Sequence, residues 1–139
     1  MNLLISTLLI AFFLGTIEPP NGAGTAGGKV ALDREFKLRL GESAQVRGEN
    51  LKVEFVAVPE DSRCPTGVDC IWEGNGKIRL RIGKPRSDAA TVELNTTVEP
   101  GNASYLNYEV RLVNLSPYPK AKQPINKKSY VATLSIRRK

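Results

Sequence analysis

The residues with the clearest chemistry in this chain are its two cysteines, Cys64 and Cys70, which enclose five residues. A cysteine metal site requires additional cysteine or histidine ligands, and the chain has no third cysteine and no histidine. A redox-active pair of the thioredoxin type has a Cys-x-x-Cys spacing at the start of a helix. Two cysteines this close in an exported chain are expected to oxidise to each other. The spacing therefore predicts a structural disulfide.

Three carboxylates surround the cysteines: Asp61, Asp69 and Glu73. Carboxylates can bind Ca²⁺, but this segment lacks the ligand spacing of an EF-hand loop, and turn carboxylates commonly accept hydrogen bonds from nearby backbone N–H groups. The absence of histidine excludes imidazole as a general base, and no Gly-x-Ser-x-Gly segment is present. We therefore predict a protein that is not an enzyme, without catalytic, metal-binding or cofactor-binding residues.

Trp72 and Arg63 are the candidate binding residues of the cysteine segment. If residues 70–72 form a strand, the side chains of Cys70 and Trp72 point to the same face, and the indole packs against the disulfide. The alternative is an exposed indole that stacks on a ligand, because Trp72 borders a loop. Arg63 lies next to Cys64 and could anchor a partner through its charge.

The cysteine segment lies between stretches in which apolar and polar residues alternate, a pattern typical of half-buried antiparallel strands. The alternation extends over residues 36–40, 51–57, 77–82, 91–94, 106–112 and 130–136. Turn-forming residues separate these stretches, including the pair Asn75-Gly76, and the prolines and lysines of residues 116–128 indicate a long loop. The sequence predicts an all-β fold: a single antiparallel β-sandwich of about seven strands with one short-range disulfide, with a barrel as the alternative.

The first 26 residues have the features of a secretory signal peptide, and we expect residues 27–139 to form one β-sandwich domain. Residues 3–17 are largely apolar but shorter than a membrane span, and the small residues Gly24-Thr25-Ala26 follow as a cleavage pattern. No lysine or arginine precedes the apolar stretch, so an uncleaved N-terminal membrane anchor is the alternative. We expect an extracytoplasmic protein, secreted or periplasmic. Cleavage would remove one charged residue, Glu18, and make the chain more positive than its net charge of +6.

A resemblance to a known family rests on the same cysteine segment. Ser62-Arg63-Cys64-Pro65, a Gly-containing turn and Cys70-Ile71-Trp72-Glu73-Gly74 resemble the signature of a family of small secreted bacterial β-domain proteins that has no assigned activity. In that family, segments like 51–59 and 77–82 flank the signature, and a Tyr-x-Val-x-Leu segment like 108–112 precedes a proline-rich turn. The resemblance covers most of residues 30–138. It implies a bacterial extracytoplasmic β domain and carries over no catalytic residue.

Basic residues occupy outward positions on several of the expected strands: Lys37 and Arg39 on one, Lys77, Arg79 and Arg81 on a second, and Arg137, Arg138 and Lys139 at the end of the last. If these strands are neighbours, they form a basic face that attracts anionic glycans or lipid headgroups. The alternative is a solvated strand face, on which lysines also discourage pairing between sheet edges. Nucleic acid is not expected as a partner, because aromatic residues do not alternate with the basic ones.

The sequence therefore predicts a secreted or periplasmic binding module without enzymatic activity. The expected contact surface is the 60–72 loop, the basic face, or both. The expected partner is an anionic glycan, a lipid headgroup or an envelope protein, and no cofactor is expected. The alternative is a protease inhibitor that presents the braced loop with Arg63 as its basic anchor, since a rigid loop loses little conformational freedom on binding.

Overall fold

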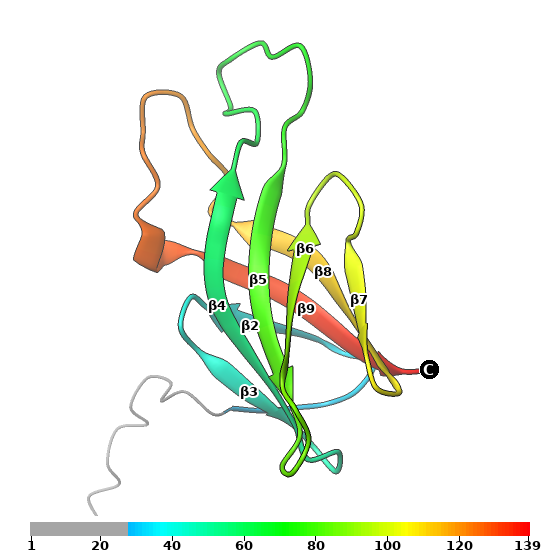
Figure 1. The fold of residues 1–139 in the computed structure, drawn as a ribbon. Helices are drawn as coiled ribbons and strands as arrows, with labels where there is room; N and C mark the ends of the chain where they lie inside the picture. Colours follow the sequence, from blue (N-terminus) through cyan, green and yellow to red (C-terminus); the bar gives the residue numbers. More distant parts are fainter. Residues whose placement is uncertain (1–27) are drawn as a thin grey trace, which may run out of the picture.

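The computed structural model describes residues 28–139, which form two β-sheets packed face to face (Figure 1). The signal peptide predicted at residues 1–26 lies outside the described residues. Within residues 28–139, no helix is long and apolar enough to cross a membrane. The elements in chain order are β1 (Gly28–Val30), β2 (Glu35–Arg39), β3 (Ser43–Val46), β4 (Leu51–Asp61), β5 (Gly76–Gly83), β6 (Ala90–Asn95), β7 (Asn102–Tyr105), β8 (Tyr108–Ser116), the 3₁₀ helix η1 (Lys127–Ser129) and β9 (Val131–Arg138).

One sheet has the strand order β1-β3-β4-β5-β6, and the other has the order β2-β9-β8-β7. Neighbouring strands are antiparallel except β1 and β3, which run parallel. The predicted all-β sandwich with one disulfide is confirmed, although the described residues form nine strands rather than about seven. The strands that alternation did not reveal are β1, β3 and β7, each of which is four residues long or shorter.

The core consists of alternate side chains from the long central strands, as the alternation predicts. The buried residues of these strands include Leu51, Val53 and Phe55 of β4, Ile78, Leu80 and Ile82 of β5, and Ala132, Leu134 and Ile136 of β9. Burying one leucine or isoleucine side chain stabilises the fold by about 1.5–3 kcal/mol. The two sheets therefore form a firm platform for the loops at their ends.

Two local expectations are wrong. The alternation predicts an inward-facing Leu106, but this residue lies in the turn between β7 and β8 with a φ of +51°, and its side chain is exposed. Asn75 and Gly76 do not form a tight turn, because Gly76 begins β5 and pairs with Asp61 at the end of β4. The chain instead passes from β4 to β5 through a wide loop, residues 62–75, which we call the cysteine loop.

Three connections gather at one end of the sandwich, which is the upper end in Figure 1. They are the cysteine loop, the β6–β7 loop (residues 96–101) and the β8–β9 connection (residues 117–130), where a long loop was expected. Backbone hydrogen bonds join the cysteine loop to the β8–β9 connection, and the first residue of β5 to the β6–β7 loop. This end of the molecule therefore joins the cysteine loop and its two neighbouring connections into one surface.

Candidate functional site

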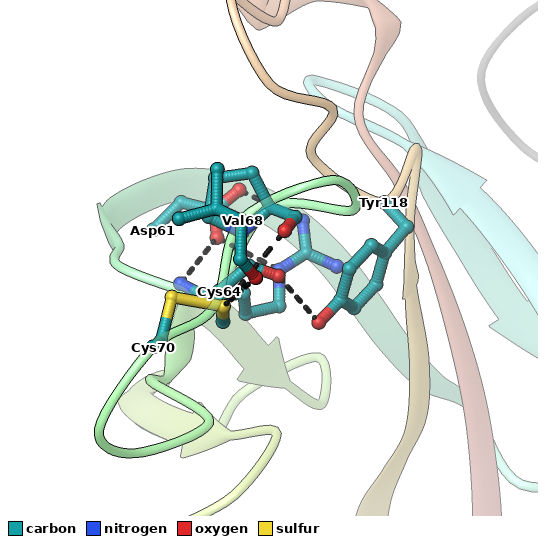
Figure 2. The surroundings of a disulfide bond; sticks show 7 residues. Asp61, Cys64, Val68, Cys70 and Tyr118 are labelled. Atoms are coloured by element: carbon teal, nitrogen blue, oxygen red, sulfur yellow. Dashed lines mark hydrogen bonds and ion pairs between the residues drawn. A yellow bond between two sulfur atoms is a disulfide. The ribbon is translucent and has the colours of Figure 1, made fainter.

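The cysteine loop is closed by a disulfide between Cys64 and Cys70, which confirms the predicted pairing (Figure 2). The two Sγ atoms lie 2.06 Å apart. Backbone hydrogen bonds join the two sides of the loop at its base: Cys64 N donates to Glu73 O at 2.8 Å, and Ser62 N donates to Asn75 O at 2.8 Å. The base of the loop therefore continues the pairing between β4 and β5.

Arg63 anchors the cysteine loop from inside, with only 6% of its surface exposed. Its Nε and Nη2 atoms donate to the two carboxylate oxygens of Asp61, each at 2.7 Å. Its Nη1 donates to Leu115 O at 2.5 Å, and Nη2 also donates to Pro117 O at 2.9 Å. The guanidinium carbon lies 5.2 Å from the centre of the Tyr118 ring. One side chain thus ties the loop to the end of β8 and to the connection that follows, using the planar donor fork that lysine lacks.

The Asp61 carboxylate is shared with Tyr130, whose hydroxyl donates to Asp61 Oδ2 at 2.8 Å. Burial raises the pKa of Asp61, but the hydrogen bonds from Arg63 and Tyr130 outweigh it and hold that pKa below its usual value. Burial and the hydrogen bond to Asp61 raise the pKa of Tyr130 to about 12. At neutral pH the carboxylate is therefore ionised and the phenol protonated. Such a pair stabilises structure and is not poised to exchange a proton near neutrality.

On one side, the cysteine loop is docked on the β8–β9 connection. Thr66 N donates to Pro119 O at 3.0 Å, and Ala121 N donates back to Thr66 O at 3.0 Å. The Tyr118 hydroxyl donates to Cys64 O at 2.8 Å, and Figure 2 shows Tyr118 reaching toward the disulfide from this neighbouring segment. The loop and the connection are therefore one body rather than two independent loops.

On the other side, Asn75 joins the base of the loop to the β6–β7 loop. Its Nδ2 donates to Asn95 Oδ1 at 2.9 Å, and its Oδ1 accepts from Thr97 N at 3.2 Å. Gly76 N donates to Thr96 Oγ1 at 2.8 Å. Sequence reasoning missed this role of Asn75, because an Asn-Gly pair is a turn signal and nothing local in the sequence identifies a partner twenty positions away.

Above this polar base, the tip of the loop exposes apolar side chains. Val68 is 47% exposed, Trp72 is 53% exposed, and Ile71 is fully exposed at 105%. Trp72 also lines a hollow of about 360 Å³, together with Lys77 and with residues of the β6–β7 loop such as Val98. Exposed large apolar side chains that are concentrated in one loop can mark a place of contact.

Two predictions for the cysteine loop are wrong. Ile71 and Trp72 lie in a bend outside the strands, so the strand rule that placed the indole on the face of Cys70 does not apply. The observed Trp72 is exposed, as the alternative expected. Arg63 is buried and its donors are occupied, so it is not available as a basic anchor for a partner.

The predicted basic face is divided between the two sheets. Lys37 and Arg39 lie on β2, whereas Lys77, Arg79 and Arg81 lie on β5 in the other sheet. Arg137 and Arg138 lie on β9, which neighbours β2, but β5 neighbours neither of these strands, so the condition for a single basic face is not met. The division follows from strand order, which the alternation of residues within a strand does not encode.

Two of the three basic residues of β5 lie at ion-pair distance from carboxylates. Arg79 Nη2 lies 2.7 Å from Glu93 Oε1, and Lys77 Nζ lies 3.8 Å from Glu60 Oε2 and 3.9 Å from Glu93 Oε2. Glu54 stands opposite Arg81 in the pairing of β4 with β5. This face therefore mixes both signs of charge, and the alternative of a solvated strand face describes it better.

Reducing the disulfide is expected to lower the free energy of unfolding by about 2 kcal/mol, because so small a ring restricts the unfolded chain only modestly. The domain should stay folded, since Arg63 and the backbone hydrogen bonds still hold the base of the loop. Urea unfolding with and without a phosphine reductant measures the difference. A variant with Cys64→Ser and Cys70→Ser should ignore the reductant, and complete unfolding of the wild type on reduction would contradict the prediction.

No family model matches this sequence, and no curated protein or solved structure matches it significantly. The resemblance of the cysteine segment to small secreted bacterial proteins therefore stays a prediction. The function has to be inferred from the geometry of the site itself.

Proposed function

We propose that this protein is a non-enzymatic binding module that contacts a partner with the tip of the cysteine loop. One observation carries the proposal: the cysteine loop combines a fixed base with an exposed apolar tip. A buried ion pair and a disulfide hold the base, whereas the apolar side chains of the tip are exposed. A surface whose shape is fixed before binding loses little conformational entropy on association. Tryptophan is also among the residues that contribute most to the affinity of protein interfaces.

The partner that best fits this tip is a protein with an apolar depression. Ile71 and Trp72 are adjacent in the chain and both exposed, so a facing pocket could receive them together. We place the module outside the cytoplasm, secreted or periplasmic, because structural disulfides persist in oxidising compartments and because residues 1–26 have the features of a signal peptide. A bacterial origin rests on the resemblance of residues 61–74 alone.

A protease inhibitor with Arg63 as its anchor is not favoured by this geometry, because the guanidinium is buried and its donors are occupied. An inhibitor that inserts Trp72 or Ile71 into an apolar specificity pocket is one case of the proposed contact. Assays against chymotrypsin-like proteases would identify that case directly.

The test compares what the immobilised protein captures from the extracellular and envelope fractions of its source cells. A variant with Val68→Ser, Ile71→Ser and Trp72→Ser should lose specific capture, because losing a central tryptophan alone commonly weakens an interface by about 2 kcal/mol or more, roughly thirtyfold. Quantitative mass spectrometry of the captured proteins provides the measurement. The matched control carries Leu106→Ser and Val113→Ser, which remove two exposed apolar side chains from β8 and the β7–β8 turn.

The control variant should capture the same proteins as the wild type. Equal capture by all three proteins, with folding verified by circular dichroism, would show that the tip is not the contact surface. Equal loss in both variants would point to general apolar adhesion instead of a site.

A further inference from the structure

A groove lies beside the cysteine loop, between the end of β4 and the β8–β9 connection, with a volume of about 610 Å³. Three exposed lysines line it: Lys120, Lys122 and Lys127. Among residues 28–139, no carboxylate lies at ion-pair distance from any of these three ammonium groups. They differ in this respect from Lys77 and Arg79 of β5.

The two acidic residues in the lining of the groove do not cancel this charge. The Asp61 carboxylate is paired with the buried Arg63, and Glu60 lies 3.8 Å from the ammonium group of Lys77. Each carboxylate thus has a cation of its own outside the lysine set. The groove therefore keeps an uncompensated positive charge.

The remaining lining of the groove is largely apolar. Val58, Pro65, Pro119 and Ile125 are half-buried, and Val58 and Ile125 pack against the hydrophobic core. Packing against the core holds Val58 and Ile125 in the wall of the groove. A ligand that fits must therefore present apolar groups as well as negative charge.

The segment that carries the lysines is held in shape along its length. Its start is bonded to Thr66 of the cysteine loop, and Gln123 N donates to Lys120 O at 3.2 Å in a turn. Its end is capped by Asn126, whose Oδ1 accepts from Lys128 N at 3.0 Å, and is fixed by the bond from Tyr130 to Asp61. The backbone positions of the lysines are thus set before any ligand arrives, which lowers the entropic cost of binding.

We infer that this groove binds an extended acidic peptide segment of a partner protein. The carboxylates of such a segment would pair with Lys120, Lys122 and Lys127, while its apolar side chains would lie on the half-buried part of the lining. Charge complementarity of this kind favours rapid association and selects partners by sign. The inference rests on residues other than the loop tip and stands independently of it.

Two other anionic partners fit the groove less well. The headgroup plane of a membrane is flat on this scale and would not enter a groove to reach Val58 and Ile125. A sulfated polysaccharide carries charge but no apolar side chains, so it would leave the apolar part of the groove unused. An acidic peptide supplies both kinds of contact in one extended chain.

The experiment measures fluorescence anisotropy of a fluorescein-labelled peptide built of Glu-Val-Pro repeats as the purified protein is added. Replacing Lys120, Lys122 and Lys127 by serine should weaken binding by about tenfold or more, because three exposed charge pairs, each weak alone, would be lost together. Binding by the wild type should weaken as salt rises, because screening shortens the reach of the charges. The lysines are exposed, so the variant should keep the melting temperature of the wild type.

The matched control replaces the same number of exposed charges away from the groove, at Lys29, Lys52 and Arg81 on β1, β4 and β5, and should bind the peptide nearly as well as the wild type. Equal weakening in both variants would overturn the inference, because net charge rather than the groove would then govern binding. No weakening in either variant would overturn it too, because the groove lysines would then take no part in binding. Equal affinity for a Gln-Val-Pro peptide would overturn it as well. Stronger lysine-dependent binding to heparin or to phosphatidylglycerol vesicles than to the peptide would replace the acidic peptide by a polysaccharide or a membrane.

Discussion

Replacing Arg63 by alanine is expected to lower the free energy of unfolding by about 3–5 kcal/mol, the usual cost of removing one partner from a buried ion pair. The change leaves the Asp61 carboxylate, whose side chain is only 10% exposed, without its cation. It also removes the donors that the carbonyl oxygens of Leu115 and Pro117 have in the native protein. Buried polar groups without partners are costly. Urea unfolding followed by circular dichroism measures the loss.

Arg79→Ala is the matched control for this substitution. Arg79 also lies 2.7 Å from a carboxylate oxygen, but the side chains of Arg79 and Glu93 are 41% and 40% exposed. An exposed pair of this kind contributes about 1 kcal/mol or less. Similar losses for Arg63→Ala and Arg79→Ala would show that burial of the Arg63 pair is not what stabilises the loop.

The buried pair also predicts how stability changes with pH. The pKa of Asp61 lies below its unfolded value of about 3.9, so the stabilisation is complete above that value and is lost as pH falls through the lowered pKa of the folded protein. In Arg63→Ala the carboxylate stays buried without its cation, so its pKa should rise and acid should favour the folded variant. The stability difference between the two proteins should therefore narrow between about pH 7 and about pH 3. A difference that widens in acid would contradict this account of Asp61.

Gly74→Ala is expected to destabilise the protein by about 3 kcal/mol or more, which places it in the exceptional tail of single substitutions. Gly74 has a φ of +72°, a backbone conformation that residues with a side chain adopt only with strain. A Cβ atom at this position would lie 1.9 Å from Ser62 O and 2.8 Å from the Cα of Arg63. Both are backbone atoms at the base of the loop, so they cannot give way without disturbing the hydrogen bonds there. Thermal unfolding and the fluorescence of Trp72 would both report the change.

Gly48→Ala isolates the steric part of this effect. Gly48 has nearly the same φ, +73°, but a Cβ built there has nothing within 4 Å. The conformational cost alone should be about 1–2 kcal/mol. Equal losses for Gly48→Ala and Gly74→Ala would mean that the base of the cysteine loop adapts to the added methyl group.

The parts of the fold that could be predicted are those whose signal is local. The alternation in β4, β5 and β9 reports burial on one face, and the structure buries those residues. The disulfide was predicted from the short spacing of the two cysteines together with the expected export of the chain. In contrast, β3 has four residues, of which Ala44 and Val46 are buried, and β1 has only three residues. Neither strand is long enough for its alternation to be recognised in the sequence.

The residues of the cysteine loop were harder to predict because their environment comes from distant segments. Asp61 and Arg63 are only two residues apart, so their pairing could have been suspected from the sequence. The carbonyl groups that accept the other hydrogen bonds of Arg63 belong to Leu115 and Pro117, more than fifty residues later. Backbone acceptors have no sequence signal, so the arginine was expected on the surface. Trp72 was misplaced for a different reason: the bend at Ile71 and Trp72 removes these residues from the strand alternation.

The basic face was mispredicted because the charge of a strand surface depends on which residues of the neighbouring strands lie opposite each basic side chain. The pairing of β5 with β4 and β6 places Glu54 opposite Arg81 and Glu93 opposite Arg79. A basic residue in the sequence therefore does not become a basic surface when its cross-strand neighbour is acidic. Lys120, Lys122 and Lys127 of the β8–β9 connection lie in no strand and have no carboxylate at ion-pair distance among the described residues.

The hydrogen bonds from Arg63 to the carbonyls of Leu115 and Pro117 span 52 and 54 positions of the chain, whereas the two cysteines are 6 positions apart. During synthesis both thiols therefore emerge well before the segment that seats the arginine, and short contacts form faster than distant ones. A chain interrupted before β8 can be fully oxidised while its cysteine loop still lacks a defined shape. A thiol assay would count such immature chains as complete, and only a probe of residues 115–130 would report that the loop has matured.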